Sequence, residues 1–471
     1  MAGVRATDRE TGRIGATSVG PYGGKKTAQV AIEQGLEVKR LTEKILAAQS
    51  ADLEAWETAL RAAVLAAGAK VLEGLLQGFG SGRQEERVRC ECGSPMESRG
   101  LKSKDLLTIL GPVSYRRSMF QCPRCHRTRY PGDEVLGVQD TTRSPGLQRM
   151  MARAGSQSTF KEGCQDLRLY AGIEVSAKDL ERVAEGIGQQ IEAWNQQEQE
   201  RILERSGPDR PDPATPVLYI CADGTGVPMI PEELQGRKGK QADGSARTRE
   251  AKLGCVFTQT GTDAKGYPVR DLDSTSFVGA IESAEPFGWR LYAEALRRGL
   301  PRARKIIALS DGSEWIKNLV QMHFPEALHI IDLYHAREHI ARLCNLLFGS
   351  DEKKLVQYRI RWWTALDSGE IEKILLQAEP HFPEDPQIRK SAQGELAYLE
   401  KNKERMRYAD FRAQRLFVGS GVVEAGCKTI IGQRMKRSGM EWSLRGANAI
   451  LSLRCIIQSG RFEDFWESHT A

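Results

Sequence analysis

Long apolar runs are missing from this sequence. No stretch of about eighteen apolar residues runs free of charge, and the alanine-rich segment Ala62–Leu76 is broken by Lys70 and Glu73. We therefore predict no membrane-spanning helix and no membrane partner. The first residues, Met1–Glu10, are charged and contain no apolar core, so no secretory signal is expected.

Cysteine is sparse as well. Ten cysteines in 471 residues are too few for a disulfide scaffold, so a reducing, cytoplasmic compartment is expected. Apolar residues are not scarce, because 40% of the chain is hydrophobic, and this excludes wholesale disorder. A chain of this length exceeds one compact core, and we expect about two to four domains.

Charge of one sign is only slightly in excess. The chain has 68 Lys and Arg against 62 Asp and Glu, a net charge of +6. The segment Lys401–Arg445 contains 11 Lys or Arg and 4 Asp or Glu, so it is more positive than the whole chain. Such a concentration is typical of a phosphate-binding surface, and a solvated helix face is the alternative.

The character of the sequence changes along the chain. Four prolines between residues 205 and 216 indicate a linker. We predict a disordered leader over 1–27, a helical segment (an oligomerisation hairpin is one interpretation) over 28–84, a cysteine-containing hairpin over 85–140, a helical segment over 141–204, the linker over 205–216, an α/β domain over 217–335, a charged helical segment over 336–417 and C-terminal helices over 418–471.

The segment over 141–204 has one interpretation beyond packing. A polar helix over Phe160–Tyr170 is followed by a turn at Gly172, and Ser176 is placed to cap a second helix with Asp179 three residues on. This pattern is similar to a helix-turn-helix, which would recognise DNA. Two short helices joined by a glycine turn are also common in helical domains, so ordinary packing stays open.

After the linker, short apolar runs alternate with helical patterns. This alternation predicts an open α/β sheet. The predicted strands are Val217–Ala222, Leu253–Thr258, Val269–Phe277, Lys305–Ser310 and Leu328–Asp332; the predicted helices are Phe287–Arg298, Glu314–Phe324, Gly421–Met435 and Ala447–Ile457.

Two cysteine pairs flank a predicted hairpin. Cys90-x-Cys92 precedes, and Cys122-x-x-Cys125 follows, strands over 106–110 and 113–120 with a turn at Gly111-Pro112. Two such pairs brought together suit a closed tetrahedral zinc site of the ribbon type, which is structural rather than catalytic. His126 is an alternative ligand, and four unrelated buried cysteines are the other interpretation.

Three carboxylates stand at positions that suit metal chemistry. Asp223 follows a predicted strand and precedes glycine, as does Asp311, and residues just past strand ends line the crevice of an open α/β sheet. Glu424 lies beside a predicted buried stripe on a helix. Carboxylates suit Mg²⁺ or Mn²⁺. The alternatives are turn capping by the two Asp-Gly pairs and an ion pair between Glu424 and Lys428.

A third motif runs from Asp332 to His339. It contains H-x-x-E-H, formed by His335, Glu338 and His339, a pattern also found in inverted-motif zinc peptidases. Two histidines four residues apart on a helix can bind zinc, with the glutamate as base. The motif is short and leaves the other carboxylates unexplained, so a zinc peptidase is a minor alternative, and ordinary helix residues are the simplest one.

The order of these blocks carries a family resemblance. The sequences CADGTGVPM, ALSDGSEWIKNLVQMHFPEALHIIDLYHAREHI and VGSGVVEAGCKTIIGQRMKRSGMEWS, within residues 85–460, resemble transposases of bacterial insertion sequences of the Kra type. These are related to the Lre type and more distantly to Mutator-like transposases. The resemblance implies a multidomain α+β protein whose RNase H-like domain is interrupted by the helical segment and preceded by helical, zinc-ribbon and helix-turn-helix-like segments.

The resemblance also implies roles for single residues. Asp223 would close the first strand and Asp311 the fourth, and Glu424 would complete a DDE triad from a late helix. Asp332 and His335 match an accessory D/C-x-x-H motif, and Trp442 matches a tryptophan that follows the glutamate. The first cysteine pair is one residue shorter than usual, which puts the ribbon's zinc site in doubt.

The implied chemistry is phosphodiester hydrolysis followed by strand transfer. Three carboxylates would hold two Mg²⁺ or Mn²⁺ ions, which activate the nucleophile and stabilise the leaving oxygen. The partners would be double-stranded DNA, as element ends and target, and further copies of the chain. The residues expected on DNA are Arg434, Lys436, Arg437, Trp442 and Arg445. An RNase H-like nuclease or resolvase and a non-catalytic zinc-ribbon regulator remain alternatives.

Overall fold

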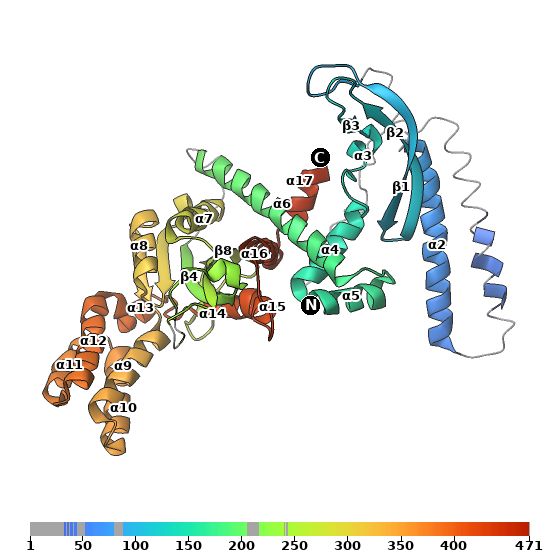
Figure 1. Cartoon of the computed structure of the whole chain (residues 1–471). Coiled ribbons are helices and arrows are strands. Elements are labelled where there is room, and N and C mark those ends of the chain that lie inside the picture. Colours follow the sequence, from blue (N-terminus) through green and yellow to red (C-terminus); the bar gives the residue numbers. More distant parts are fainter. Residues whose placement is uncertain are drawn as a thin grey trace. The chain divides into compact units, whose positions relative to one another are not determined.

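The protein is described by a computed structural model that covers residues 52–79, 88–204, 216–239, 241 and 244–470, together with 33, 35–36, 38–40 and 42–44. The chain forms two compact units, Met1–Ala154 with Phe160–Leu180, and Gly155–Thr159 with Glu181–Ala471 (Figure 1). It is a mixed α+β multidomain protein. The predicted leader lies outside the described residues, as does the predicted linker apart from its last residue.

The first unit is built on a long helix and a hairpin. Helix α2 (Leu53–Phe79) contributes Ala69 and Leu76 to a core that it shares with β1 (Glu97–Thr108) and β2 (Gly111–Gln121). The antiparallel register pairs Thr108 with Gly111, so the turn consists of residues 109–110 and not of the predicted Gly111-Pro112. The Thr108 hydroxyl donates to the Gly111 carbonyl (2.8 Å), and Gly111 takes the positive φ that closes the turn.

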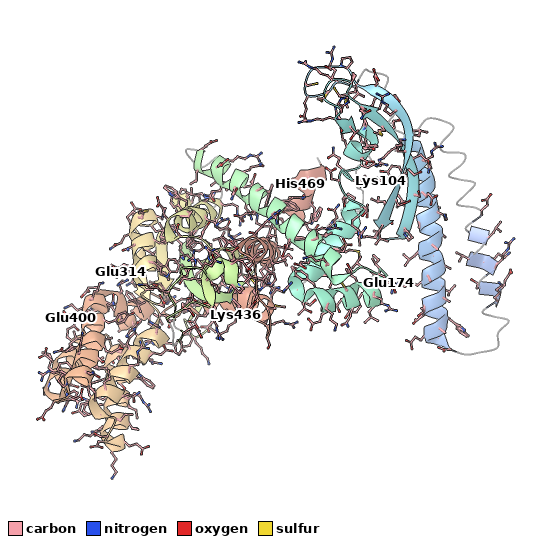
Figure 2. All side chains as sticks on the ribbon, in the orientation of Figure 1. Lys104, Glu174, Glu314, Glu400, Lys436 and His469 are labelled. Carbon is pink, nitrogen blue, oxygen red and sulfur yellow. The ribbon has the colours of Figure 1, made fainter. Side chains whose placement is uncertain are left out.

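A buried carboxylate joins the hairpin to the segment that follows it. Asp133, on α3 (Pro131–Val135), is 3% exposed and accepts hydrogen bonds from Lys104 Nζ (2.9 Å), the Tyr115 hydroxyl (2.9 Å) and Arg117 Nε (2.8 Å). Burying this charge costs little because two cations and a hydroxyl surround it. Figure 2 labels Lys104 on β1. The short strand β3 (Thr128–Arg129) completes the sheet.

Helices follow, as the sequence predicts. After α4 (Pro145–Gln157), α5 (Phe160–Asp166) continues as a π-helical turn, η1 (Leu167–Ala171), and ends at Gly172 with φ of 69°. The predicted cap is confirmed, because the Ser176 hydroxyl accepts the Asp179 N–H (3.1 Å) at the start of α6 (Ala177–Glu204). Helix α6 has 28 residues, which is far longer than the second helix that the pattern required.

The second unit contains a five-stranded sheet in the order β10-β9-β4-β5-β8. Strands β4, β9 and β10 are parallel, whereas β5 is antiparallel to its two neighbours β4 and β8. The strands are β4 (Val217–Pro228), β5 (Thr248–Gln259), β8 (Ser276–Ala280), β9 (Lys305–Ser310) and β10 (Leu328–Ile331). The bounds predicted for β9 are confirmed, but the strand predicted over 269–277 divides between β8 and the small strand β7 (Pro268–Val269), which pairs with β6 (Gly261–Thr262).

Alternating residues of β4 face two different cores. Ile220 and Ala222 pack with Phe287 of α7 (Ala284–Arg297) and Ile316 of α8 (Glu314–His323), which cover one face of the sheet. On the other face Tyr219 stacks on Phe257 of β5, with ring centroids 4.8 Å apart. Because side chains alternate between the two faces of a strand, Asp223, four residues after Tyr219, lies on this second face as well.

Helices fill the rest of the unit (Figure 1). The predicted charged helical segment consists of α9 (Leu333–Phe348), α10 (Glu352–Asp367), α11 (Ile371–Ala378), α12 (Pro386–Asn402) and α13 (Tyr408–Ala413), with short 3₁₀ turns η4 (Glu379–His381) and η5 (Lys403–Met406). The late helices are α14 (Gly421–Gly426), the π-helical η6 (Cys427–Gly432), α15 (Gln433–Met435), α16 (Leu444–Gln458) and α17 (Phe462–Thr470). No helix within the described residues is long and apolar enough to cross a bilayer.

Candidate carboxylate site and cysteine cluster

Two of the predicted acids lie at one edge of the sheet. The parallel pairing of β4 with β9 ends at Cys221 and Leu309, and Asp223 and Asp311 each come two residues further along. Because β4 and β9 are parallel, both carboxylates project from the same end of neighbouring strands.

Asp223 does not close its strand, contrary to the prediction. Strand β4 continues to Pro228 because β5 keeps pairing with it, with Asp223 opposite Leu253 and Pro228 opposite Thr248. A Cβ on Gly224 would lie 2.5 Å from Oε1 of Glu250 on the neighbouring strand, a flexible side-chain end that would have to shift.

The environment of Asp223 disfavours its charged form. Burial raises the pKa of Asp223, and the charges of Asp311 and Glu424 raise it further, against hydrogen bonds from the Gly224 N–H and the Cys427 side chain. The three acids are therefore electrostatic neighbours. Among the described residues, however, only four cysteines bring ligand atoms together as a ready metal-binding group, so the acids do not form a closed ligand set.

Local backbone contacts also hold the two aspartates. Asp223 Oδ1 accepts the Gly224 N–H (2.7 Å), and Asp311 Oδ1 accepts the Ser313 N–H (2.8 Å). These are the contacts that the turn-capping alternative predicts. The backbone carbonyl of Asp311 also accepts a hydrogen bond from the Tyr398 hydroxyl (3.0 Å), which ties β9 to α12.

Glu424 lies where the sequence pattern places it. The predicted buried stripe beside it, Val423, Cys427, Ile430 and Ile431, is confirmed. Among the described residues Glu424 makes no ion pair with Lys428; its Oε1 instead accepts the Ser420 hydroxyl (2.7 Å). The helix changes to π geometry over Cys427–Gly432, and such π segments are frequent at functional sites.

Asp332 is buried, and both of its carboxylate oxygens accept hydrogen bonds. It is 2% exposed and caps α9, with Oδ1 accepting the His335 N–H (2.8 Å). Its Oδ2 accepts the Ser420 N–H (2.5 Å) and lies 3.0 Å from the Ser420 hydroxyl oxygen. Ser420 was not identified from the sequence, although its place in Gly-Ser-Gly before a helix is a recognisable capping signal.

The two histidines of the H-x-x-E-H motif face each other. The Nε2 atoms of His335 and His339 are 3.3 Å apart, and His339 Nδ1 lies 2.5 Å from Oε2 of Glu395 on α12. Burial lowers the pKa of His339. Within the described part of the chain no third ligand converges on this pair, and Glu338 is mostly exposed, so the geometry gives the zinc-peptidase alternative no support.

Two of the residues expected on DNA are internal, which corrects the prediction. Arg434 is fully buried; its Nε donates to the Gly155 carbonyl (3.0 Å), and its guanidinium lies 5.0 Å from the centroid of the Trp442 ring. Trp442 is 6% exposed, and its Nε1 donates to the Met435 carbonyl (3.0 Å). Neither side chain can reach a phosphate in this structure, because packing against distant segments encloses both.

The other three basic residues are on the surface. Lys436, Arg437 and Arg445 are exposed. Lys436, labelled in Figure 2, donates to the Thr225 hydroxyl on β4, two residues from Asp223. Arg445 donates to Oε1 of Gln189 (2.5 Å). The exposed cation Lys436, from the segment after α15, lies against the strand that carries Asp223 and is placed to meet an anion at this edge.

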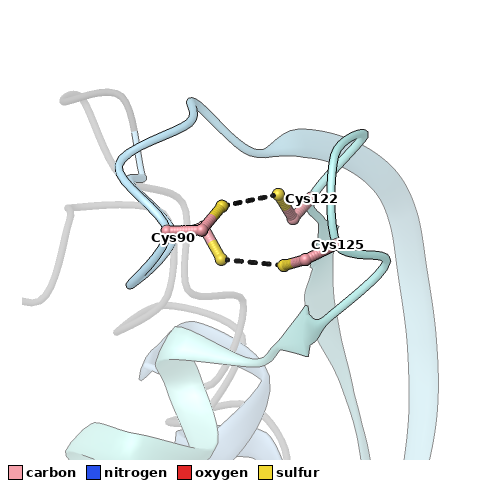
Figure 3. A group of neighbouring side chains, drawn as sticks. Cys90, Cys122 and Cys125 are labelled. Carbon is pink, nitrogen blue, oxygen red and sulfur yellow. Dashed lines mark hydrogen bonds between the residues drawn. The ribbon is translucent and has the colours of Figure 1, made fainter.

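The four predicted cysteines converge in the first unit. Cys90 Sγ lies 3.4 Å from Cys125 Sγ, and Cys92 Sγ lies 3.5 Å from Cys122 Sγ, with all four sulfurs within 4.8 Å of one another (Figure 3 labels Cys90, Cys122 and Cys125). Four sulfurs around Zn²⁺ at about 2.3 Å would be separated by about 3.8 Å. The cluster therefore fits a zinc ion, and the short first pair does not prevent this. His126 is not one of the four converging ligands.

Tight turns present these sulfurs. The Cys90 N–H donates to the Ser94 carbonyl (2.9 Å), and the Cys122 N–H donates to the Arg127 carbonyl (2.9 Å). Hydrogen bonds from the backbone and hydroxyl of Ser94 lower the pKa of the Cys92 thiol to about 6. Against a hydrogen bond from the Arg127 backbone, contacts with Cys90 and Cys122 raise the pKa of the Cys125 thiol to about 12. The turn therefore favours the metal-binding thiolate form at Cys92 and not at Cys125.

The fold and the cysteine cluster define a multidomain α+β protein whose four converging cysteines are compatible with a zinc site. The chain belongs to the family described as "Uncharacterised protein family (UPF0236)", whose model matches residues 51–464. It is 22% identical over 376 residues to the "UPF0236 protein in vanSb 3'region" of Streptococcus gallolyticus, covering 78% of this chain and 75% of that relative. A solved structure, "Drosophila P element transposase strand transfer complex", matches 69% of this chain and 80% of its own at 9% identity and a TM-score of 0.22, a likeness too low to carry an argument.

Proposed function

We propose that this chain is a DNA transposase of the DDE class, similar to those of Kra-type insertion sequences. The observation that carries the proposal is the edge of the sheet where Asp223 and Asp311 follow paired parallel strands, with the charge of Glu424 near enough to raise the pKa of Asp223. The triad expected from the resemblance consists of these same residues.

The sheet supports an RNase H-like interpretation of the second unit. When the five strands are numbered in chain order, they lie side by side in the order 3-2-1-4-5. The second strand is antiparallel to the first, and the fourth and fifth strands are parallel to the first. Asp223 lies on the first strand, Asp311 directly follows the fourth strand, and Glu424 lies on the late helix α14. Helices α9 to α13 lie between Asp311 and Glu424 in the chain. This is the order that the resemblance implies.

The donor set suits divalent cations of the Mg²⁺ or Mn²⁺ type. Three carboxylates supply hard oxygen ligands, and a site that disfavours ionised Asp223 is relieved by a nearby cation. When bound, two such ions supply nucleophile activation and stabilisation of the leaving oxygen for phosphodiester hydrolysis and strand transfer. Asp223, Asp311 and Glu424 would hold them.

Other residues of the chain would handle the DNA. Lys436, Arg437 and Arg445 would bind phosphates, so affinity should fall with salt. The ribbon held by the four cysteines and the helix-turn-helix-like segment would recognise the element ends, because a catalytic sheet meets mostly backbone. Joining two ends to a target favours more than one copy of the chain on DNA.

The test is cleavage and joining of DNA that carries the ends of the genetic element encoding the chain. Asp223→Asn and Asp311→Asn should each abolish cleavage and leave DNA binding intact, because asparagine keeps the backbone contacts and loses the charge. The matched control is Asp263→Asn, at an exposed aspartate whose Oδ1 also accepts backbone N–H groups in a turn, from Lys265 (2.9 Å) and Tyr267 (2.8 Å). This control should cleave normally.

Three outcomes would redirect the proposal. Normal cleavage by either triad variant would show that the acids are assigned wrongly. Cleavage by the native chain without joining would favour a nuclease or resolvase. Binding of end-containing DNA without cleavage, in the native chain with Mg²⁺ or Mn²⁺ supplied, would favour a zinc-ribbon regulator.

A further inference from the structure

One serine stands between two carboxylates. The Ser420 hydroxyl lies 2.7 Å from Glu424 Oε1 and 3.0 Å from Asp332 Oδ2, and the residue is 5% exposed. A hydroxyl has one proton and donates it to one carboxylate at a time; because Asp332 Oδ2 already accepts the Ser420 N–H (2.5 Å), the shorter contact assigns the hydroxyl proton to Glu424 Oε1. Burial keeps water from replacing it.

The position of Ser420 makes this contact unusual. Ser420 precedes α14, where a serine hydroxyl ordinarily accepts an N–H from the first helical turn. Here the hydroxyl makes no such bond, and the Val423 and Glu424 N–H groups bond to the Ser420 carbonyl at 3.0 Å and 3.2 Å. The hydroxyl is therefore committed to the carboxylates.

Asp332 anchors this link to the sheet. It follows β10 directly, its two oxygens accept the N–H groups of His335 and Ser420, and the Leu333 N–H donates to the Val418 carbonyl (2.9 Å). The segment that leads into α14 is thus fixed to the end of β10 at two points.

We infer that Asp332 and Ser420 are positioning residues for Glu424. Asp332 fixes Ser420, and Ser420 holds Oε1 of Glu424. In the described part of the chain no hydrogen bond or ion pair reaches Oε2 of Glu424, which leaves this oxygen for a cation shared with Asp223. The inference rests on the proposed function, and it gives the D-x-x-H motif a role in orienting a metal-binding carboxylate rather than in binding metal itself.

The test is binding of Mn²⁺ to the zinc-loaded full-length chain without DNA, measured from the electron paramagnetic resonance signal of free Mn²⁺. Ser420→Ala should weaken binding about ten-fold, the size of effect typical when a hydrogen bond to a metal ligand is lost. Asp332→Asn should weaken it in the same direction. The double variant should bind no more weakly than the weaker single variant, because both act through one contact.

The matched control is Ser443→Ala. Ser443 caps α16 in the ordinary way, its hydroxyl accepting the Gly446 N–H (3.0 Å). This variant should lose thermal stability and keep its Mn²⁺ affinity. If Ser420→Ala instead behaves like the control, with lower stability and unchanged Mn²⁺ affinity, Ser420 is only structural and the inference is wrong.

The variant Glu424→Gln distinguishes failure of the positioning role from failure of the proposed function. If this variant binds Mn²⁺ like the native chain, Glu424 is not a ligand and the proposed function itself fails. If Glu424→Gln loses binding while folded Ser420→Ala and Asp332→Asn keep it, the triad stands and only the positioning role is overturned.

Discussion

Replacing Gly188 on α6 with alanine tests how closely α6 packs on α16. A Cβ at this position would lie 2.2 Å from the carbonyl oxygen of Ala449 and 2.6 Å from its carbonyl carbon. Both atoms belong to the backbone of α16, so no side-chain rotation relieves the clash. The helices would have to separate by about 1 Å to restore normal contact distances.

Gly186, one residue before Ile187 on the same helix, gives the matched control. A Cβ there meets nothing within 4 Å. Alanine at either position favours the helix by about 1 kcal/mol, a gain common to both variants. The difference between them therefore isolates the steric cost at Gly188, which is about 3 kcal/mol for a clash with backbone.

Thermal unfolding of the full chain, followed by tryptophan fluorescence, measures this difference. Gly186→Ala should raise the midpoint of the second unit slightly, and Gly188→Ala should lower it, with roughly 5–10 °C between the two. Hydrogen exchange should quicken in α6 and α16 of Gly188→Ala alone. Equal stability of the two variants would mean that the helices do not approach as the structure shows.

Three further predictions concern the metal cluster, pH and the basic segment. Metal analysis should find about one zinc per chain, and none after Cys122→Ser with Cys125→Ser; retained zinc would refute the cluster. Burial lowers the pKa of His329 to about 3, so the unfolded chain binds a proton that the folded one does not, and stability should fall as pH drops below about 6.5. Between pH 6.5 and pH 5 the native chain should lose about 2 kcal/mol more than His329→Asn in denaturation experiments, since the contribution of His339, whose pKa is also lowered, is common to both; an equal loss in the two chains would exclude His329 as the source of the difference. Arg434→Ala should unfold more easily, whereas Lys436→Ala should keep its stability and bind DNA with a smaller salt dependence; the reverse pattern would contradict their placement.

Local patterns in the sequence predicted much of the structure. The two cysteine pairs, the bounds of β9 and the cap of α6 by Ser176 each depend on residues that are near in sequence or on a simple hairpin. The apolar stripe beside Glu424 belongs to the same group, since helical spacing alone places it.

Two predictions failed because they required knowledge of distant segments. The end of β4 was placed at Ala222 because glycine and aspartate follow, yet β5 continues to pair with the strand through Pro228. Arg434 was expected on the surface because it is charged, yet it donates to the carbonyl of Gly155, which is 279 positions away in the chain.

The candidate site likewise combines features that the local sequence predicts with features that depend on distant contacts. The sequence by itself determined which acids are present, in which order, and that four cysteines suit a zinc ion. Only the tertiary structure decided that Asp332 shares Ser420 with Glu424: Glu424 is four residues from the serine, but Asp332 is 88 positions away, and sequence separation does not predict a contact of about 3 Å between such distant groups. Burial is likewise a property of the packed whole, so it decided which cations face solvent and which are part of the interior.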